Sequence, residues 1–171
     1  MSRYCLFVGV FLSYLGLSAQ EGLMVGGGPS FELDESLFGL NARLFYGTGP
    51  TFCFGPEITF FPYKEIDKEQ ELSIVDLNVN AHYIFEISHI LGIYPLGGIN
   101  YTIEKERLIA DTDTVEEIGE FGLNYGFGAH YNLNRFFIFA EFKGVAGQLN
   151  DEFLTIGIIL PFGKPRTQHH E

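Results

Sequence analysis

Charged and amide side chains recur inside segments that are otherwise apolar, and any chemistry would have to come from them. Arg43, Glu57 and Asp76 occupy the polar face of three successive segments. If those segments lie side by side, one arginine and two carboxylates meet in a shared interior. Such a cluster could act as a gate or as a coupled acid pair. We favour a structural interpretation, in which the paired charges plug the interior and fix strand register.

Lys143 is expected to form a second cluster of this kind, toward the outer end, with Glu120, Asn124 or Glu141. The polar side chains that we predict to share the interior are Arg43, Glu57, Asp76, Asn78, His82, Glu120, Asn124, His130, Glu141 and Lys143.

His82 and His130 raise the question of acid–base catalysis. His130 and Glu120 are ten residues apart in one segment, about 33 Å at the rise of a β-strand, so they cannot act together. The histidines at 169–170 end a polar tail and are expected to be solvated. No helical pattern follows the glycines at 26–28, which argues against a phosphate-binding loop. The sequence therefore predicts no catalytic, cofactor-binding or metal site.

The elements that must position these side chains are β-strands, because hydrophobicity alternates with a period of two from residue 22 onward. In the clearest segment, the odd positions from Phe121 to Tyr131 are apolar and the even positions from Glu120 to Asn132 are small or polar. The expected strands are residues 23–31, 37–47, 51–62, 72–85, 89–103, 117–131, 134–146 and 152–162.

Three features indicate that the apolar faces point outward. The opposite faces consist of glycine, asparagine and isolated charges, which suit a narrow interior better than a water-exposed surface. Aromatic residues stand near both ends of the apolar faces, as in the interfacial belts of membrane barrels. Short connections at 46–50, 86–88 and 132–135 alternate with long, charged loops at 63–71 and 104–116.

These strands predict an all-β fold, a closed antiparallel up-and-down transmembrane β-barrel of about eight strands. Each backbone polar group left unpaired in hydrocarbon costs several kcal/mol, so a sheet immersed in lipid must close. An interior of about eight strands is filled by side chains. Pro56, Pro95 and Pro161 remove ladder donors, so bulges or shifted strand ends are expected there.

The chain as a whole indicates one exported domain. Its 171 residues begin with a positive charge, an apolar run and a small-residue exit at Ser18–Ala19, which predicts a signal peptide over 1–19. The barrel then spans 20–162, and 163–171 form a polar tail. Removal of the signal would leave Cys53 without a partner for a disulfide. The net charge of -12 argues against nucleic-acid binding.

The last strand carries the most specific motif. Thr155–Phe162 has a polar residue, then Gly157, then apolar positions that end in an aromatic residue. This pattern resembles the assembly signal of the small OmpA/OmpX-like outer-membrane barrels, and the likeness covers about residues 20–162. The resemblance implies a place in the bacterial outer membrane, contact with its lipid and insertion by its assembly machinery. The polar tail and the absence of tryptophan depart from the family's pattern.

The sequence thus predicts a non-enzymatic, monomeric outer-membrane barrel that needs no cofactor. It would serve as envelope structure, or as a scaffold whose acidic loops at 63–71 and 104–116 meet an extracellular ligand or divalent ions. A lipid-modifying barrel enzyme and a soluble ligand-binding barrel remain as alternatives. A small-solute channel is disfavoured because the interior is expected to be blocked.

Overall fold

The computed structural model describes residues 22–109 and 111–162, so the predicted signal peptide and tail lie outside the described residues. No helix within these ranges is long and apolar enough to cross a bilayer. The described residues form the strands β1 (Gly22–Glu32), β2 (Phe38–Gly47), β3 (Phe52–Glu65), β4 (Gln70–Tyr83), β5 (Phe85–Glu86), β6 (Leu91–Leu108), β7 (Asp111–Asn132), β8 (Phe137–Ala146) and β9 (Glu152–Phe162).

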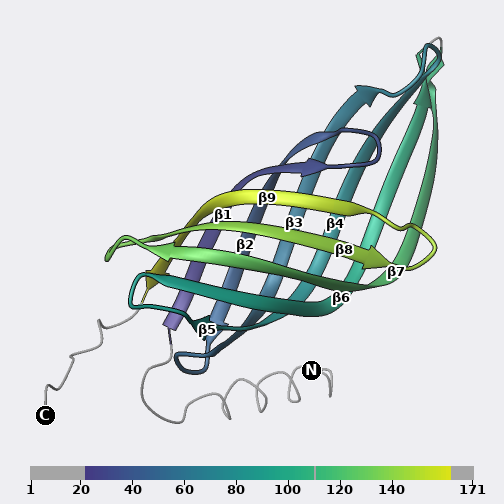
Figure 1. Ribbon diagram of the computed structural model, residues 1–171. Helices are drawn as coiled ribbons and strands as arrows, with labels where there is room; N and C mark the ends of the chain where they lie inside the picture. Colours follow the sequence, from purple (N-terminus) through teal and green to yellow (C-terminus); the bar gives the residue numbers. More distant parts are fainter. Residues whose placement is uncertain (1–21, 110, 163–171) are drawn as a thin grey trace, which may run out of the picture.

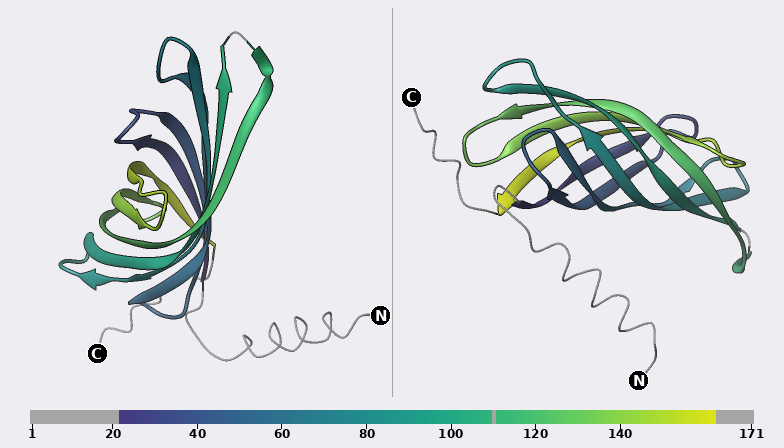
Figure 2. Two further views of the ribbon diagram at one scale, coloured as in Figure 1. Left: turned by 90° about the vertical axis from the view of Figure 1, so that its right-hand side faces the viewer. Right: turned by 90° about the horizontal axis from the view of Figure 1, so that it is seen from below.

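The strands form one antiparallel sheet that closes on itself (Figure 1, Figure 2). Strands adjacent in the chain are paired, β4 pairs with β6, and the first strand pairs with the last from Leu23↔Phe162 to Glu32↔Phe153. The short β5 continues β4 and pairs with β6 in the same register as β4 does. β4 and β5 therefore count as one strand of the barrel, which has eight strands. The predicted closed barrel of about eight strands is confirmed.

The strands turn their apolar residues outward and their small, polar and charged residues inward. Along β2 the even positions from Phe38 to Leu44 are exposed, and the odd positions from Gly39 to Gly47 are buried. Leu40 is 70% exposed, whereas Arg43 is only 3% exposed. The same alternation runs along most of β9. The orientation of the two faces is the predicted one.

The two ends of the barrel differ in how far the strands continue. The near end holds Gly22, Phe162 and the connections at 48–51, 87–90 and 133–136. The far end holds the connections at 33–37, 66–69 and 147–151, together with the end of β6 at Leu108 and the start of β7 at Asp111. β3, β4, β6 and β7 continue furthest there, and Gln70 of β4 still pairs with Leu108 at the end of β6 (Figure 1). This part of the four strands forms a sheet extension.

The prediction of long loops at 63–71 and 104–116 is wrong, because most of these residues continue the strands. Opposite charges face each other across this extension: Glu71 pairs with Arg107 at 2.6 Å, and Lys105 with Glu117 at 2.8 Å. Such cross-strand pairs stabilise a sheet that has water on both faces. Charge density therefore does not mark a loop in this part of the chain.

The bulges expected at the three prolines are absent, since Pro56, Pro95 and Pro161 each keep a ladder partner on a neighbouring strand. A proline whose nitrogen faces away from the paired strand removes no ladder bond from that pair. The register shifts instead between Phe61 and Lys64, a stretch that contains Pro62, and between Arg107 and Leu108. The break between β4 and β5 does lie beside Pro95.

Gly55 is required by the close approach of β3 to β2. A Cβ at this position would overlap the main-chain oxygen of Leu44. Gly97 on β6 has room by contrast, because the nearest atom to its added Cβ is the main-chain oxygen of Asn124 at 3.8 Å.

We expect Gly55→Ala to lower the free energy of unfolding by about 1–3 kcal/mol, the usual cost of overpacking. The matched control Gly97→Ala should be neutral or slightly stabilising, because alanine restricts the unfolded chain. The measurement is the urea midpoint at which the folded, heat-modifiable gel band disappears in detergent. Equal midpoints for the two variants would contradict the argument.

Candidate functional site

Arg43 on β2 is the centre of the barrel interior. Its guanidinium donates two hydrogen bonds of 3.0 Å to the Glu141 carboxylate of β8 and lies 3.0 Å from Glu57 Oε2 of β3. Its Nε donates to Asn41 Oδ1 at 2.9 Å, and its Cζ lies 4.2 Å from the centre of the Phe139 ring. Such a two-pronged contact fixes the direction of the carboxylate as well as its distance.

Lys143 on β8 extends this network toward the far end. Its Nζ donates to Glu57 Oε1 at 2.8 Å and to Asp76 Oδ2 at 2.6 Å. Glu57 therefore links the two cations, and a continuous chain runs from Glu141 through Arg43, Glu57 and Lys143 to Asp76. All five side chains are at most 4% exposed. A charge can be buried in this way only because each one is paired.

The structure brings these residues together as one network rather than the two clusters predicted. Asp76 pairs with Lys143 and not with Arg43, and Arg43 takes Glu141 instead. Lys143 makes no ion pair with Glu120, Asn124 or Glu141, so its predicted partner set is wrong. The partners lie on opposite walls of a narrow tube, and strand tilt decides which residues meet across it.

Amide side chains of β4, β6 and β7 continue the network from Asp76. Asn78 and Asn100 both donate to the Asp76 carboxylate, and Thr102 donates to it at 3.2 Å. Asn124 donates hydrogen bonds of 2.7 Å to Asn78 Oδ1 and to Asn80 Oδ1. Asn80, Asn100 and Thr102 were not among the predicted site residues, although each stands at a polar position of the alternating pattern.

His82 is buried on the near-end side of the network. Its ring stacks on Tyr94 at 4.7 Å, and its Nε2 lies 3.8 Å from Glu141 Oε2. The Tyr94 hydroxyl donates to the same carboxylate oxygen at 3.0 Å. His130 is only partly buried and packs on Tyr94 and Phe137 rather than joining the ion pairs.

Glu120 is partly exposed on β7 and lies apart from the interior ion pairs. Its place in the predicted polar set followed from the alternation alone. Glu120 is thus absent from the ion pairs that join Arg43, Glu57, Asp76, Glu141 and Lys143.

An apolar cluster fills the interior beyond the ion pairs and was not predicted. It consists of Leu37, Phe61, Leu72, Ile74, Val145 and Phe153, with Ile66 against it. The Phe61 and Phe153 rings stack at 5.5 Å, and Lys143 Nζ lies 5.0 Å from the centre of the Phe153 ring. Phe61, Leu72, Ile74, Val145 and Phe153 lie on the inward face of their strands, so alternation alone could have placed them inside. The interior is thus filled by paired charges, amides and aromatic rings.

Three carboxylates gather at the far end: Glu32, Asp34 and Asp151, of which Glu32 and Asp151 are buried. Burial raises the pKa of Asp151 to about 7, and the nearby carboxylates of Glu104, Glu32, Asp76 and Asp34 raise it further. Because Glu32 and Asp151 are far apart in the chain, the alternating pattern gave no reason to connect them. Only the pairing of β1 with β9 brings them together.

The fold described above is similar to that of known proteins. Neither a protein-family model nor a curated protein matches the sequence. Solved structures match at low identity: the attachment invasion locus protein Ail of Yersinia pestis has 17% identity and a TM-score of 0.62, covering 85% of this chain and 100% of Ail. The chain has the fold of the small OmpA/OmpX-like outer-membrane barrels.

Two further barrels agree with this assignment of the fold. The N-terminal β-barrel domain of Pseudomonas aeruginosa OprF has 16% identity and a TM-score of 0.64, covering 85% of this chain and 100% of that domain. A major outer-membrane protein of Thermus thermophilus has 11% identity and a TM-score of 0.67, covering 84% of this chain and 100% of its own. Ail has also been solved in complex with the heparin analogue sucrose octasulfate.

We expect Arg43→Met to destabilise the barrel by about 3–5 kcal/mol, because it leaves the buried carboxylates of Glu57 and Glu141 without their cation. The triple variant Arg43→Met, Glu57→Gln, Glu141→Gln should recover most of that loss, since it removes the unpaired charges together. Urea midpoints in detergent give the comparison. A triple variant as unstable as the single one would show that lost packing, and not unpaired charge, is the cause.

A second expectation concerns pH. The folded protein holds a proton on Asp151 that the unfolded chain releases near pH 4, so raising the pH from about 4 to 7 should progressively lower stability. Asp151→Asn should weaken this dependence, and the exposed control Glu69→Gln should not. Urea midpoints at pH 5 and pH 8 in the presence of a chelator measure it. Parallel pH profiles for wild type and Asp151→Asn would refute the assignment.

Proposed function

We propose that this protein is a non-enzymatic barrel of the bacterial outer membrane, which anchors an acidic sheet extension outside the cell as a surface for external partners. The observation that carries the proposal is the inverted distribution of side chains. The wall exposes large apolar residues, such as Phe121 at 78% and Phe127 at 65%, while Arg43 and Lys143 are buried in the interior. An apolar belt of this kind is unfavourable in water and favourable in lipid.

The filled interior supports an anchoring role over transport or carriage of a ligand. The chain of ion pairs crosses the interior at Arg43 and Lys143, and the apolar cluster around Phe61 occupies the space beyond. A solute would have to break buried ion pairs to pass. A soluble carrier would need an empty, apolar interior and a polar wall, which is the reverse of this distribution.

The buried histidine argues against lipid-modifying catalysis. His82 is enclosed between Phe45 and Tyr94, with ring centres 4.6 and 4.7 Å away. A lipid chain on the outer wall could not reach it without opening the barrel. The enclosure of His82 therefore favours a surface role over lipid-modifying catalysis.

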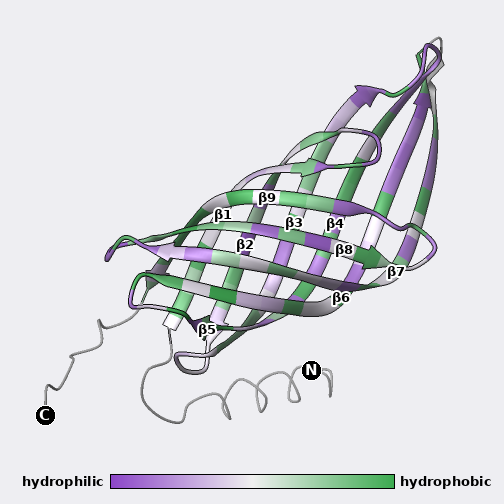
Figure 3. Cartoon of the chain, viewed as in Figure 1, coloured by the Kyte–Doolittle hydropathy of each residue, from purple (hydrophilic) through white to green (hydrophobic). Residues whose placement is uncertain are grey.

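The sheet extension supports a surface role. β7 pairs with β8 only from Leu123↔Ala146 onward, and Gly147 lies against Phe121 and Gly122. Within the described residues, the edge of β7 over 111–120 therefore has no strand partner on that side. The tips of the two long hairpins are joined by a hydrogen bond of 2.9 Å from Ile109 N to Glu69 O. Much of the far-end part of β6 and β7 is hydrophilic (purple in Figure 3). A free edge can accept a strand from a partner.

The charge of the extension favours a basic partner. Acidic residues outnumber basic ones between residues 104 and 120. Polyanions of the kind solved with Ail would be repelled by this surface. We propose that the partner bound at this strand edge is a protein with a basic contact patch.

Orientation in the membrane can be tested with single cysteines. Starting from Cys53→Ser, we expect Lys68→Cys in the β3–β4 connection to react with a membrane-impermeant maleimide on intact cells. The matched variant Arg135→Cys in the β7–β8 connection should react only after lysis. Labelling of Arg135→Cys alone would reverse the orientation, and recovery of the protein without detergent would overturn the membrane placement.

A further inference from the structure

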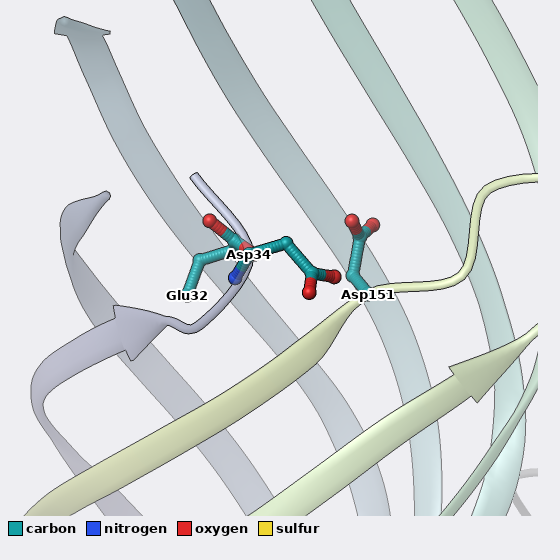
Figure 4. Close-up of side chains that lie close together, drawn as sticks. All are labelled: Glu32, Asp34 and Asp151. Carbon is teal, nitrogen blue, oxygen red and sulfur yellow. The ribbon is translucent and has the colours of Figure 1, made fainter. Parts of the chain in front are cut away.

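Two connections of the far end bring three carboxylates to one point on the rim. Glu32 ends β1, Asp34 lies two residues later, and Asp151 immediately precedes β9. One carboxylate oxygen from each lies within 4.8 Å of the others. Figure 4 shows the side chains gathered between the two connections, with the carboxylates of Asp34 and Asp151 close to each other.

The backbone around these carboxylates is held in place. Leu33 N donates to Glu152 O at 2.9 Å, which ties the β1–β2 connection to β9, and Val145 N donates to Asp151 O at 2.9 Å. The Glu32 carboxylate accepts from Asp34 N at 2.5 Å and from Glu35 N at 2.8 Å. Main-chain contacts therefore fix the Glu32 carboxylate and the backbone at Leu33 and Asp151.

No cation of the described residues compensates this charge. The ion pairs of the described residues leave out Glu32, Asp34 and Asp151. Lys64 lies near the β1–β2 connection, but its Nζ donates to the main-chain oxygens of Glu35 and Ser36 at 3.1 and 2.8 Å.

The burial of Asp151 also points to a ligand, independently of the clustering of the three carboxylates. The residue is 8% exposed, and its Oδ2 is buried without any hydrogen-bond partner among the described residues. A buried carboxylate oxygen with no donor is costly unless something outside the chain satisfies it. Everywhere else in this interior the buried carboxylates have a cation or donors.

We propose that Glu32, Asp34 and Asp151 bind a divalent cation, with Ca²⁺ preferred over Mg²⁺. Ca²⁺ bonds oxygen at about 2.3–2.6 Å, so ligands on opposite sides of the ion lie about 4.6–5.2 Å apart, which accommodates the observed spread. Mg²⁺ requires a smaller, nearly ideal octahedron, with opposite ligands about 4.2 Å apart. Water and main-chain oxygens complete the coordination. The sequence predicted no metal site, since it gave no contact between Glu32 and Asp151.

The bound ion would join the first strand to the last. Glu32 and Asp34 belong to the β1 side of the barrel closure, and Asp151 belongs to the β9 side. A cation that binds only the folded barrel stabilises it in proportion to its occupancy. This inference depends on the rim geometry alone, so it stands or falls separately from the membrane orientation.

The test is calorimetric titration of the refolded, full barrel in detergent with CaCl₂, and in parallel with MgCl₂. We expect one saturable Ca²⁺ site with a Kd on the order of 10⁻⁴–10⁻³ M, the range of extracellular calcium modules, and weaker Mg²⁺ binding. Asp34→Asn and Asp151→Asn should each weaken Ca²⁺ binding at least tenfold. The exposed control Glu69→Gln, which removes the same charge elsewhere at the far end, should bind like wild type.

A second readout separates binding from folding. Ca²⁺ should raise the urea midpoint of wild type and Glu69→Gln relative to a chelator, and should leave that of Asp34→Asn unchanged. Because Asp34 is exposed, its variant remains a usable test even if Asp151→Asn fails to refold. No saturable binding up to about 10 mM Ca²⁺, ten times the weakest Kd expected, would overturn the proposal. Undiminished binding by Asp34→Asn would do the same.

Discussion

The structure depends on how Arg43 and Lys143 are neutralised inside a tube that offers them no water. Each cation reaches across the interior to carboxylates on other strands, and Glu57 serves both. These pairs connect the neighbouring strands β2, β3 and β4 with β8, which is separated from β2 by β1 and β9. The ion pairs therefore hold these strands in one relative register, because a slip of any of them would leave a buried charge without its partner.

The apolar outer wall and the polar interior follow from the same alternation of residues. With a period of two, a strand that places Arg43 inward must place Leu44 and Ala42 outward. The interior is small, so glycine and asparagine recur at inward positions, and bulky rings such as Phe139 and Tyr94 appear where they pack against Arg43 and His82. The wall then needs an apolar surrounding, which is the basis for placing this barrel in a membrane.

Alternation was enough to predict the strands and the two faces, because both depend on neighbouring residues. It was not enough to predict that Arg43 meets Glu141, 98 residues away. That contact depends on strand tilt and on the shear of the closed sheet, which no single strand encodes. The extension beyond Phe61 was missed for another reason. There, charges that indicated a loop are paired across strands, as between Glu71 and Arg107.

The pairing of β1 with β9 also sets the order in which the chain can fold. Leu23 and Phe162 are almost the whole described chain apart, so their contact contributes strongly to a high contact order. Hairpins such as β6–β7 join strands that are adjacent in the chain, whereas closure requires β1 and β9 to meet. Until then, two unpaired strand edges remain open to the wrong neighbours. A partner that covers these two edges would therefore act before β1 and β9 pair.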